Sequence, residues 1–223
     1  MDVAPFPRVR PMLASTGPPP SDARGWHCEL KFDGFRQISF VNGADVPLRV
    51  ESRSGRHLTG SLPELGELPA AVGTDAVLDG ELVVLGAGGR PDFYALGPRL
   101  AASRPVSVER ARRRSPVTLA IFDLLWLDGR SLMGLSYRDR RRQLEDLALD
   151  GPSWFTVPSW PGVGDDLLEA CSAMGLEGLV IKRLDNSPYR PGQRARHWVK
   201  RKCPGWNVEH GLRRHPGRRS LPR

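Results

Sequence analysis

The sequence predicts an α+β fold built on antiparallel sheets, and three observations support that class. Segments rich in β-type residues follow one another closely, without the regular crossover helices that a doubly wound parallel sheet needs. Long apolar runs end in glycine or in an Asp-Gly pair, as buried strands do. Apolar residues at helical spacing occupy only a few short segments. We therefore expect antiparallel sheets flanked by helices in one folded unit, residues 24–202.

The N-terminal half is expected to be mainly β-structure. Residues 1–23 contain GPPPSD and should form an extended arm with little regular structure. Strands are predicted at 26–34, 35–43, 47–55 and 76–86. The first two lie around an Asp-Gly turn, and the fourth, AVLDGELVVLG, has the pattern of a buried strand. Residues 63–72 fit a short helix.

The C-terminal half alternates helices and strands. Helices are predicted at 92–114, 137–150 and 165–175, of which the first is basic and the last begins with acidic residues suited to a helix N-terminus. Strands are predicted at 117–129, 176–183 and 197–202, and the first of these ends in an Asp-Gly turn. The tail 203–223 is polar, basic and punctuated by glycine and proline, so we expect it to be disordered.

Composition limits the function classes. The 223 residues are 39% apolar, which is enough for a buried core. No apolar run reaches the roughly 18 residues that cross a bilayer, and the N-terminus lacks a signal-peptide layout, so we expect a cytoplasmic protein without a membrane partner. Cys28, Cys171 and Cys203 are far apart and lack metal-ligand spacing, which indicates inert thiols.

Lysine is scarce. Of the 33 basic residues, 29 are arginine and four are lysine: Lys31, Lys182, Lys200 and Lys202. Both side chains carry a positive charge, but only lysine can lose its proton and act as a nucleophile. Lys31 precedes an Asp-Gly turn, with Arg36 close enough to lower its pKa or to hold an anionic substrate. The simpler alternative for this motif is an exposed lysine in a hairpin.

Three carboxylates each lie beside a glycine at a strand end: Asp33, Glu81 and Glu177. Such carboxylates can bind Mg²⁺ or accept a hydrogen bond from a ribose, and glycine lets a ligand approach the backbone. Asp79 is interpreted as an ordinary turn carboxylate. Phe122 fits either a ring stacked on a purine or a plain core residue.

A net charge of +8 favours a polyanionic partner, with nucleic acid first, because basic side chains displace the counterions of phosphates. An arginine-rich solvated surface is the alternative.

A series of motifs resembles one family. ELKFDGFR at 29–36 is similar to motif I, K-x-D-G-x-R, of the covalent nucleotidyltransferases. Further motifs follow in the family's order: SRSGRHLT at 52–59, LDGEL at 78–82, IFDLLWLDG at 121–129, EGLVIKR at 177–183 and WVKRK at 198–202. Together with PMLA at 11–14 and SPYRPGQRARHW at 187–198, they most resemble ATP-dependent DNA ligases of the bacterial ligase D type.

The resemblance implies an activity. In the family, the motif I lysine attacks the α-phosphate of ATP and forms lysyl-AMP, which maps the nucleophile onto Lys31. The AMP then passes to a DNA 5′-phosphate, and a 3′-hydroxyl seals the nick. The nucleotide-binding residues implied by the match are Glu29, Arg36, Arg53, Glu81, Phe122, Lys182, Lys200 and Lys202. Asp33 and Glu177 are expected near Mg²⁺ or Mn²⁺.

The resemblance also implies a fold and partners. The fold is the nucleotidyltransferase, ATP-grasp-like fold, with the nucleotide between two sheets. Family ligases continue into an OB-fold domain, which we do not expect here, so sealing should be weak without a partner that supplies that surface. The expected partners are DNA with nicks or breaks and end-joining or repair proteins, and a monomer is expected. The alternatives are an RNA ligase, a capping-type nucleotidyltransferase and a non-catalytic DNA-binding remnant.

Overall fold

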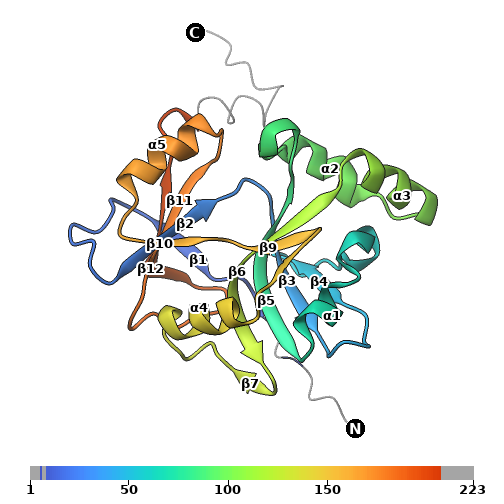
Figure 1. The fold of residues 1–223 in the computed structure, drawn as a ribbon, viewed down its shortest axis with the longest axis horizontal. Helices are drawn as coiled ribbons and strands as arrows, with labels where there is room; N and C mark the ends of the chain where they lie inside the picture. Colours follow the sequence, from blue (N-terminus) through green and yellow to red (C-terminus); the bar gives the residue numbers. More distant parts are fainter. Residues whose placement is uncertain (1–5, 7–8, 207–223) are drawn as a thin grey trace, which may run out of the picture.

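A computed structural model describes residue 6 and residues 9–206, which form two packed sheets with helices around them (Figure 1). The first sheet has the order β1-β12-β11-β2-β10. Its strands are β1 (Leu13–Thr16), β2 (Trp26–Lys31), β10 (Ser159–Pro161), β11 (Gly178–Arg183) and β12 (Arg194–Lys202).

The second sheet has the order β4-β3-β5-β6-β9-β8, with β7 paired to β6 alongside. Its strands are β3 (Phe35–Val41), β4 (Arg49–Ser52), β5 (Ala76–Val84), β6 (Val117–Leu127), β7 (Arg130–Ser131), β8 (Asp150–Gly151) and β9 (Trp154–Thr156). The helices are α1 (Leu68–Val72), α2 (Phe93–Ala101), α3 (Pro105–Arg114), α4 (Tyr137–Asp146) and α5 (Asp165–Ala173). Short 3₁₀ turns are η1 (Thr59–Ser61), η2 (Pro63–Leu65) and η3 (Ala87–Gly89).

The α+β class is confirmed, and most strand pairs are antiparallel. Two pairs are parallel: β1 with β12, and β6 with β9. The first joins strands from opposite ends of the chain, so no local pattern could have revealed it. Strand β1 also lies within the arm that was predicted to be irregular, and it closes one edge of the first sheet.

The two strands around the Lys31 turn do not pair with each other. Strand β2 pairs with β11 and β10, whereas β3 pairs with β5 and β4 in the other sheet. The segment between them therefore crosses from one sheet to the other. Gly34 allows this crossing, because a Cβ at that position would lie 2.2 Å from the carbonyl oxygen of Leu82.

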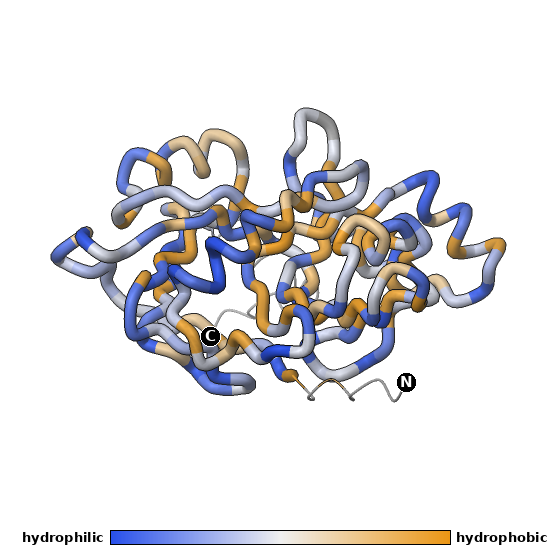
Figure 2. The backbone as a smooth tube through the Cα atoms, turned by 60° about the horizontal axis from the view of Figure 1, so that its bottom comes forward, coloured by the Kyte–Doolittle hydropathy of each residue, from blue (hydrophilic) through white to orange (hydrophobic). Residues whose placement is uncertain are grey.

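Apolar residues fill three regions, and Figure 2 shows the apolar segments running through the middle of the body. The largest cluster lies on the outer face of the second sheet, under α1, α2 and α4. A second cluster fills the space between the sheets and includes Met12, Phe40, Val77, Leu125 and Trp198. The third packs α5 onto the first sheet and contains all three cysteines, which are buried free thiols. Burial in this apolar cluster raises the pKa of Cys171 to about 11.

Most predicted elements are confirmed, with shifted ends. The segment 92–114 divides into α2 and α3, and the last strand, β12, begins three residues before the predicted start. The segment 63–72 divides into η2 and α1. Trp206, in the predicted tail, is buried, and residues 207–223 lie outside the described part of the chain. Among the described residues, no helix is both long and apolar enough to cross a membrane.

Candidate active site

A cavity of about 250 Å³ lies between the two sheets. Its walls come from β1, β2, β11 and β12 on one side and from β3, β5 and β6 on the other. Eight of the eleven predicted site residues line it: Glu29, Lys31, Arg36, Arg53, Glu81, Phe122, Lys182 and Lys200. Asp33, Glu177 and Lys202 do not line it. The fold thus brings together residues that lie up to 171 positions apart, from Glu29 to Lys200.

Lys31 lies at the end of β2, with a quarter of its side chain exposed. Its Nζ donates to Glu177 Oε2 at 2.6 Å, and Lys202 Nζ lies 2.8 Å from Glu177 Oε1. Burial of Glu177 opposes its charge, but Lys31 and Lys202 outweigh that effect and lower its pKa. Lysines therefore contact both oxygens of the carboxylate that was predicted to approach a metal.

Lys182 is almost fully buried beneath the cavity. Its Nζ lies 2.5 Å from Glu29 Oε2 and donates to the Phe122 carbonyl at 3.0 Å. The same ammonium lies over the rings of Trp198, Tyr137 and Phe122, at 4.3, 4.7 and 4.9 Å from their centroids. Burial lowers the pKa of Lys182, and Glu29 counteracts this. Since its charge is compensated inside the fold, Lys182 fixes the floor of the cavity.

Two helical residues hold Glu29 from behind. The Tyr137 hydroxyl donates to Glu29 Oε1, and Arg141 Nη1 lies 3.4 Å from the same oxygen. Both residues come from α4, which sequence reasoning did not connect with the site. Tyr137 and Arg141 lie 108 and 112 positions from Glu29 in the sequence, so no local motif predicts these contacts.

Arg36 is fixed by a carboxylate whose role was misinterpreted from the sequence. Its guanidinium contacts both oxygens of Asp79, at 2.5 and 2.6 Å, and lies 4.3 Å from the centroid of the Phe122 ring. Asp79 is fully buried within β5 and also accepts from the Tyr189 hydroxyl at 2.5 Å. Burial raises the pKa of Asp79, and Arg36 opposes that rise. The prediction of a turn carboxylate was wrong.

The remaining predicted residues form the walls. Phe122 is partly exposed to the cavity and contacts Trp198 edge to face at 6.3 Å, a position suited to a flat ligand ring. Glu81 is partly buried, and this burial, opposed by Arg36 and Lys31, raises its pKa to about 7. Arg53 is exposed after β4, and its backbone N–H donates to the Arg36 carbonyl at 3.1 Å. Burial lowers the pKa of Lys200, and nearby Lys31 adds to this.

A cavity lined by a partly exposed lysine, aromatic rings and basic side chains fits a nucleotide with its phosphates. The sequence profile of the ATP dependent DNA ligase domain matches residues 11–202. The chain belongs to this family.

Related proteins support this family assignment. The chain is 37% identical to the multifunctional non-homologous end joining protein LigD of Mycolicibacterium smegmatis over 201 residues, covering 89% of this chain and 24% of that protein. It is 37% identical over 204 residues to DNA ligase C1 of the same organism, covering 87% of this chain and 57% of that protein. The chain thus spans about a quarter of LigD and little more than half of the shorter ligase.

Solved structures share the fold of this ligase domain. A mycobacterial DNA ligase D complexed with ATP and MES superimposes with a TM-score of 0.73 at 37% identity, covering 87% of this chain and 60% of that chain. The ligase domain of Mycobacterium tuberculosis LigD gives a TM-score of 0.72 at 36% identity, with the same coverage. The predicted nucleotidyltransferase fold is therefore confirmed.

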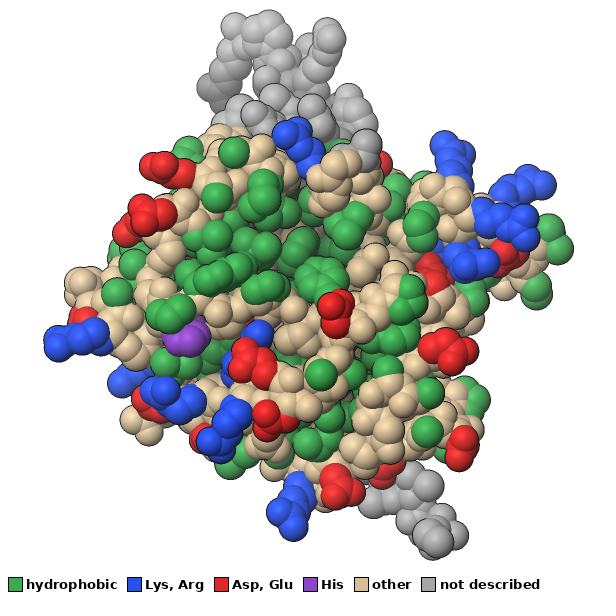
Figure 3. Space-filling view, viewed as in Figure 1, with side chains coloured by type: hydrophobic (Ala, Val, Ile, Leu, Met, Phe, Trp, Pro, Cys, Tyr) green, Lys and Arg blue, Asp and Glu red, His purple; other side chains and the backbone are tan. Residues whose placement is uncertain are grey.

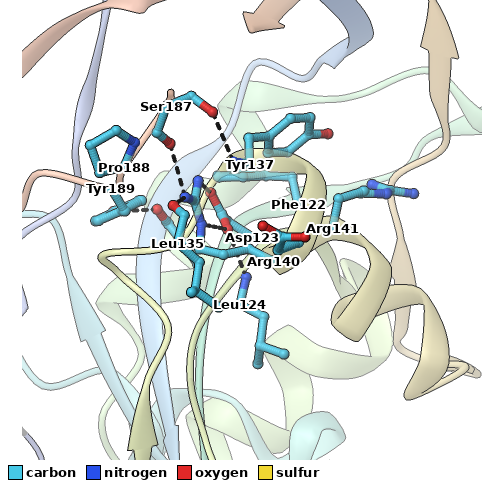
Figure 4. Close-up of polar contacts among 12 residues, drawn as sticks. Phe122, Asp123, Leu124, Leu135, Tyr137, Arg140, Arg141, Ser187, Pro188 and Tyr189 are labelled. Atoms are coloured by element: carbon cyan, nitrogen blue, oxygen red, sulfur yellow. Dashed lines mark hydrogen bonds and ion pairs between the residues drawn. The ribbon is translucent and has the colours of Figure 1, made fainter. Parts of the chain in front are cut away.

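A second polar network anchors the wall of the ligase domain that carries Phe122 (Figure 4). Asp123, the next residue, forms a fully buried pair with Arg140 of α4 at 2.8 and 2.9 Å. Arg140 also donates to the carbonyls of Leu135 and Ser187, at 2.8 and 3.0 Å. Because Arg140 donates to each of these acceptors, the pair is not left as an uncompensated buried charge. The network fixes α4, β6 and the loop after β11 relative to one another.

No ready-made metal cage is present in the described part of this ligase domain, where no three His, Cys, Asp or Glu side chains are grouped to hold an ion. Mg²⁺ usually binds through one or two carboxylates together with substrate phosphates. The donor set, with Glu177 at the rim and Glu81 in the wall, fits an ion that arrives with a triphosphate. The metal roles of Asp33 and Glu177 stay predictions.

Proposed function

We propose that this chain is the adenylating domain of an ATP-dependent DNA ligase that seals nicks or breaks during end-joining repair. The observation that supports this most is the position of Lys31, which lines the cavity together with Arg36 and Lys200 and whose amine contacts Glu177. Lys31 and Lys200 both combine partial exposure with a place in that wall, and Lys31 is the one that stands in the K-x-D-G-x-R motif.

The first step is attack of Lys31 Nζ on the α-phosphorus of ATP. The attacking nitrogen needs a free electron pair, so the ammonium first gives up a proton to solvent. A nitrogen–phosphorus bond then forms, the bond from the α-phosphorus to the bridging oxygen breaks, and pyrophosphate leaves. Arg36, Arg53 and Lys200 line the cavity where they can neutralise phosphate charge.

The next steps transfer the AMP to DNA. A 5′-phosphate oxygen attacks the phosphorus of the lysyl adduct, and the nitrogen–phosphorus bond breaks, which regenerates Lys31. The 3′-hydroxyl of the neighbouring strand then attacks the DNA 5′-phosphorus, loses its proton and displaces AMP. Bound Mg²⁺ or Mn²⁺ would neutralise phosphate charge, and Glu177 and Asp33 are the residues we expect to hold it.

Labelling of the chain tests the proposal. Incubation with ATP and Mg²⁺ should add the mass of one AMP to the protein, and Lys31→Arg should abolish the adduct because guanidinium stays protonated. Lys200→Arg is the control that keeps the nucleophile, and peptide mapping should place AMP on Lys31. AMP found on Lys182, Lys200 or Lys202 would refute the assignment.

The same assay separates the alternatives. A capping-type enzyme would form its adduct with GTP, and an RNA ligase would prefer nicked RNA over nicked DNA. A DNA-binding remnant would bind nicked DNA and form no adduct. We expect an adduct with ATP and transfer of AMP to nicked DNA.

A further inference from the structure

Helix α3 carries a concentration of arginine outside the active site. Residues 104–114 hold five arginines and one glutamate. Arg112 and Arg113 both bond to that glutamate, Glu109, at 2.8 Å. The other three, Arg104, Arg110 and Arg114, are exposed, and no ion pair with another described residue is found for them.

These three arginines line one groove. It lies between α2 and α3, and its other lining residues include Tyr94, Ser107 and one carboxylate, Asp92. Arg110 and Arg114 are four residues apart, so they share one face of the helix. Figure 3 shows basic side chains gathered at this edge of the molecule, where α2 and α3 project in Figure 1. Helix α3 buries only Val108, so most of its surface is available to a partner.

Some exposed arginines elsewhere are paired: Arg24 lies 3.1 Å from Asp22, and Arg138 lies 2.9 Å from Asp185. Others, such as Arg56 and Arg190, form no ion pair within the described part of the chain. The groove gathers three such unpaired guanidinium groups along a single wall. Guanidinium groups recognise phosphate oxygens through paired hydrogen bonds, and a row of them fits a phosphate backbone.

The groove is physically tied to the rim of the active site. Phe93, the first residue of α2, stacks on Phe35 with centroids 6.0 Å apart, and Phe35 follows Lys31 by four residues. Arg90, just before α2, donates to the Ala173 carbonyl at 3.3 Å, next to the loop that carries Glu177. With nine residues, α2 is about 13 Å long. This is less than half of one turn of duplex, roughly 34 Å, so a duplex held at Lys31 can reach the groove with one flank.

We propose that the groove between α2 and α3 binds backbone phosphates of the duplex that flanks the nick. This proposal rests on the proposed function, since it takes the partner to be the DNA substrate. Contacts of this kind carry no sequence information, but they orient the duplex on the enzyme.

Binding of nicked duplex to R104Q/R110Q/R114Q tests the proposal. Each lost phosphate contact should lower the slope of log Kobs against log salt by about 1, so we expect a fall of about 2 to 3 and weaker binding at low salt. The control R24Q/R130Q/R138Q removes the same formal charge at exposed positions away from α3. AMP adduct formation should be unchanged in both variants, and thermal unfolding verifies that both are folded.

Flank length provides a second readout. The two variants should have the same slope of log Kobs against log salt when both duplex flanks are shorter than half a turn, which is about 5 base pairs. On duplexes with long flanks, equal lowering of the slope in both variants would overturn the proposal and show a general charge effect. Unchanged slopes in both variants would also overturn it and show that the groove makes no contact with DNA. Absence of the AMP adduct in the wild-type chain would refute the proposed function instead, because that reaction needs no DNA.

Discussion

At the residue scale, Glu177 holds Lys31 and Lys202 at the same time, with one lysine on each oxygen. This arrangement orients the proposed nucleophile before substrate arrives. Because the folded state lowers the pKa of Glu177, its ion pairs stabilise the fold above the unfolded pKa of about 4.5. This stabilisation is lost as the pH falls through the pKa of Glu177 in the folded protein.

Glu81 behaves in the opposite way and provides a prediction for stability. Its pKa is about 7 in the folded protein against 4.5 in the unfolded chain. Below pH 4.5 both states are protonated, between the two values stability falls as the pH rises, and above 7 the loss is complete. Glu81→Gln should therefore raise the free energy of unfolding at pH 8 by on the order of 1–3 kcal/mol, with little effect at pH 4.

Urea denaturation at the two pH values measures this difference. Glu169→Gln, an exposed carboxylate on α5, is the control and should show no such contrast. The same Glu81 variant should form the AMP adduct more slowly if the carboxylate accepts from the ribose. An equal change in stability at both pH values would contradict the proposed cause.

Sequence reasoning found these residues through short motifs but missed their supports. Lys31, Glu81 and Lys182 each stand in a recognisable motif, and the structure places all three around one cavity. Asp79 was missed because a carboxylate beside glycine usually marks a turn. Its position two residues before Glu81 in a strand was the available signal, since alternate residues share a face. No pattern in the sequence around Tyr137 and Arg141 indicated that they contact Glu29.

At the element scale, the strands were predictable and their partners were not. Apolar patterning located β5 and β6, because both are buried and continuous. The assignment of β2 and β3 to different sheets depends on Gly34 and its contact with β5, which is distant in sequence. Pairing of β1 with β12 joins residues about 180 positions apart. Tertiary packing decides such pairings.

Gly178 at the start of β11 provides a prediction for strand pairing. Its φ is +145°, and a Cβ there would lie 2.1 Å from the Arg201 carbonyl oxygen. Gly178→Ala should therefore push β11 away from β12, displace Glu177 and lower the free energy of unfolding by about 2–4 kcal/mol. Guanidinium titration and AMP adduct formation measure the two effects.

The matched control is Gly97→Ala in α2, where a Cβ meets no atom within 4 Å. Alanine favours helix over glycine, but Gly97 precedes Pro98, whose ring crowds a Cβ in the helical conformation, so the net change should stay within about 0.5 kcal/mol. If Gly178→Ala behaved like Gly97→Ala, the close approach of β11 to β12 would not constrain the fold.

At the scale of the whole molecule, residues 9–16 are part of the folded body. Met12 is fully buried between the sheets, and Met12, Leu13 and Ala14 line the active-site cavity. Met12→Asp would bury an unpaired charge and should cost about 4 kcal/mol or more. Thr16→Asp, at the exposed end of β1, which begins directly after Met12, should stay within about 0.5 kcal/mol of wild type. Equal unfolding midpoints would mean that the segment is a dispensable arm.

The distribution of lysine has a consequence for chemical labelling. All four lysines lie on β2, β11 and β12, in or beside the cavity, while every other basic side chain except histidine is arginine. Reagents that acylate primary amines leave guanidinium groups untouched, so on this protein their side-chain targets are confined to one small region. Lys182 is shielded by burial, and Lys31 and Lys202 share one carboxylate. Even an acylating reagent that does not resemble a nucleotide would therefore label lysines at the active site. Bound ATP would protect those lysines from the reagent.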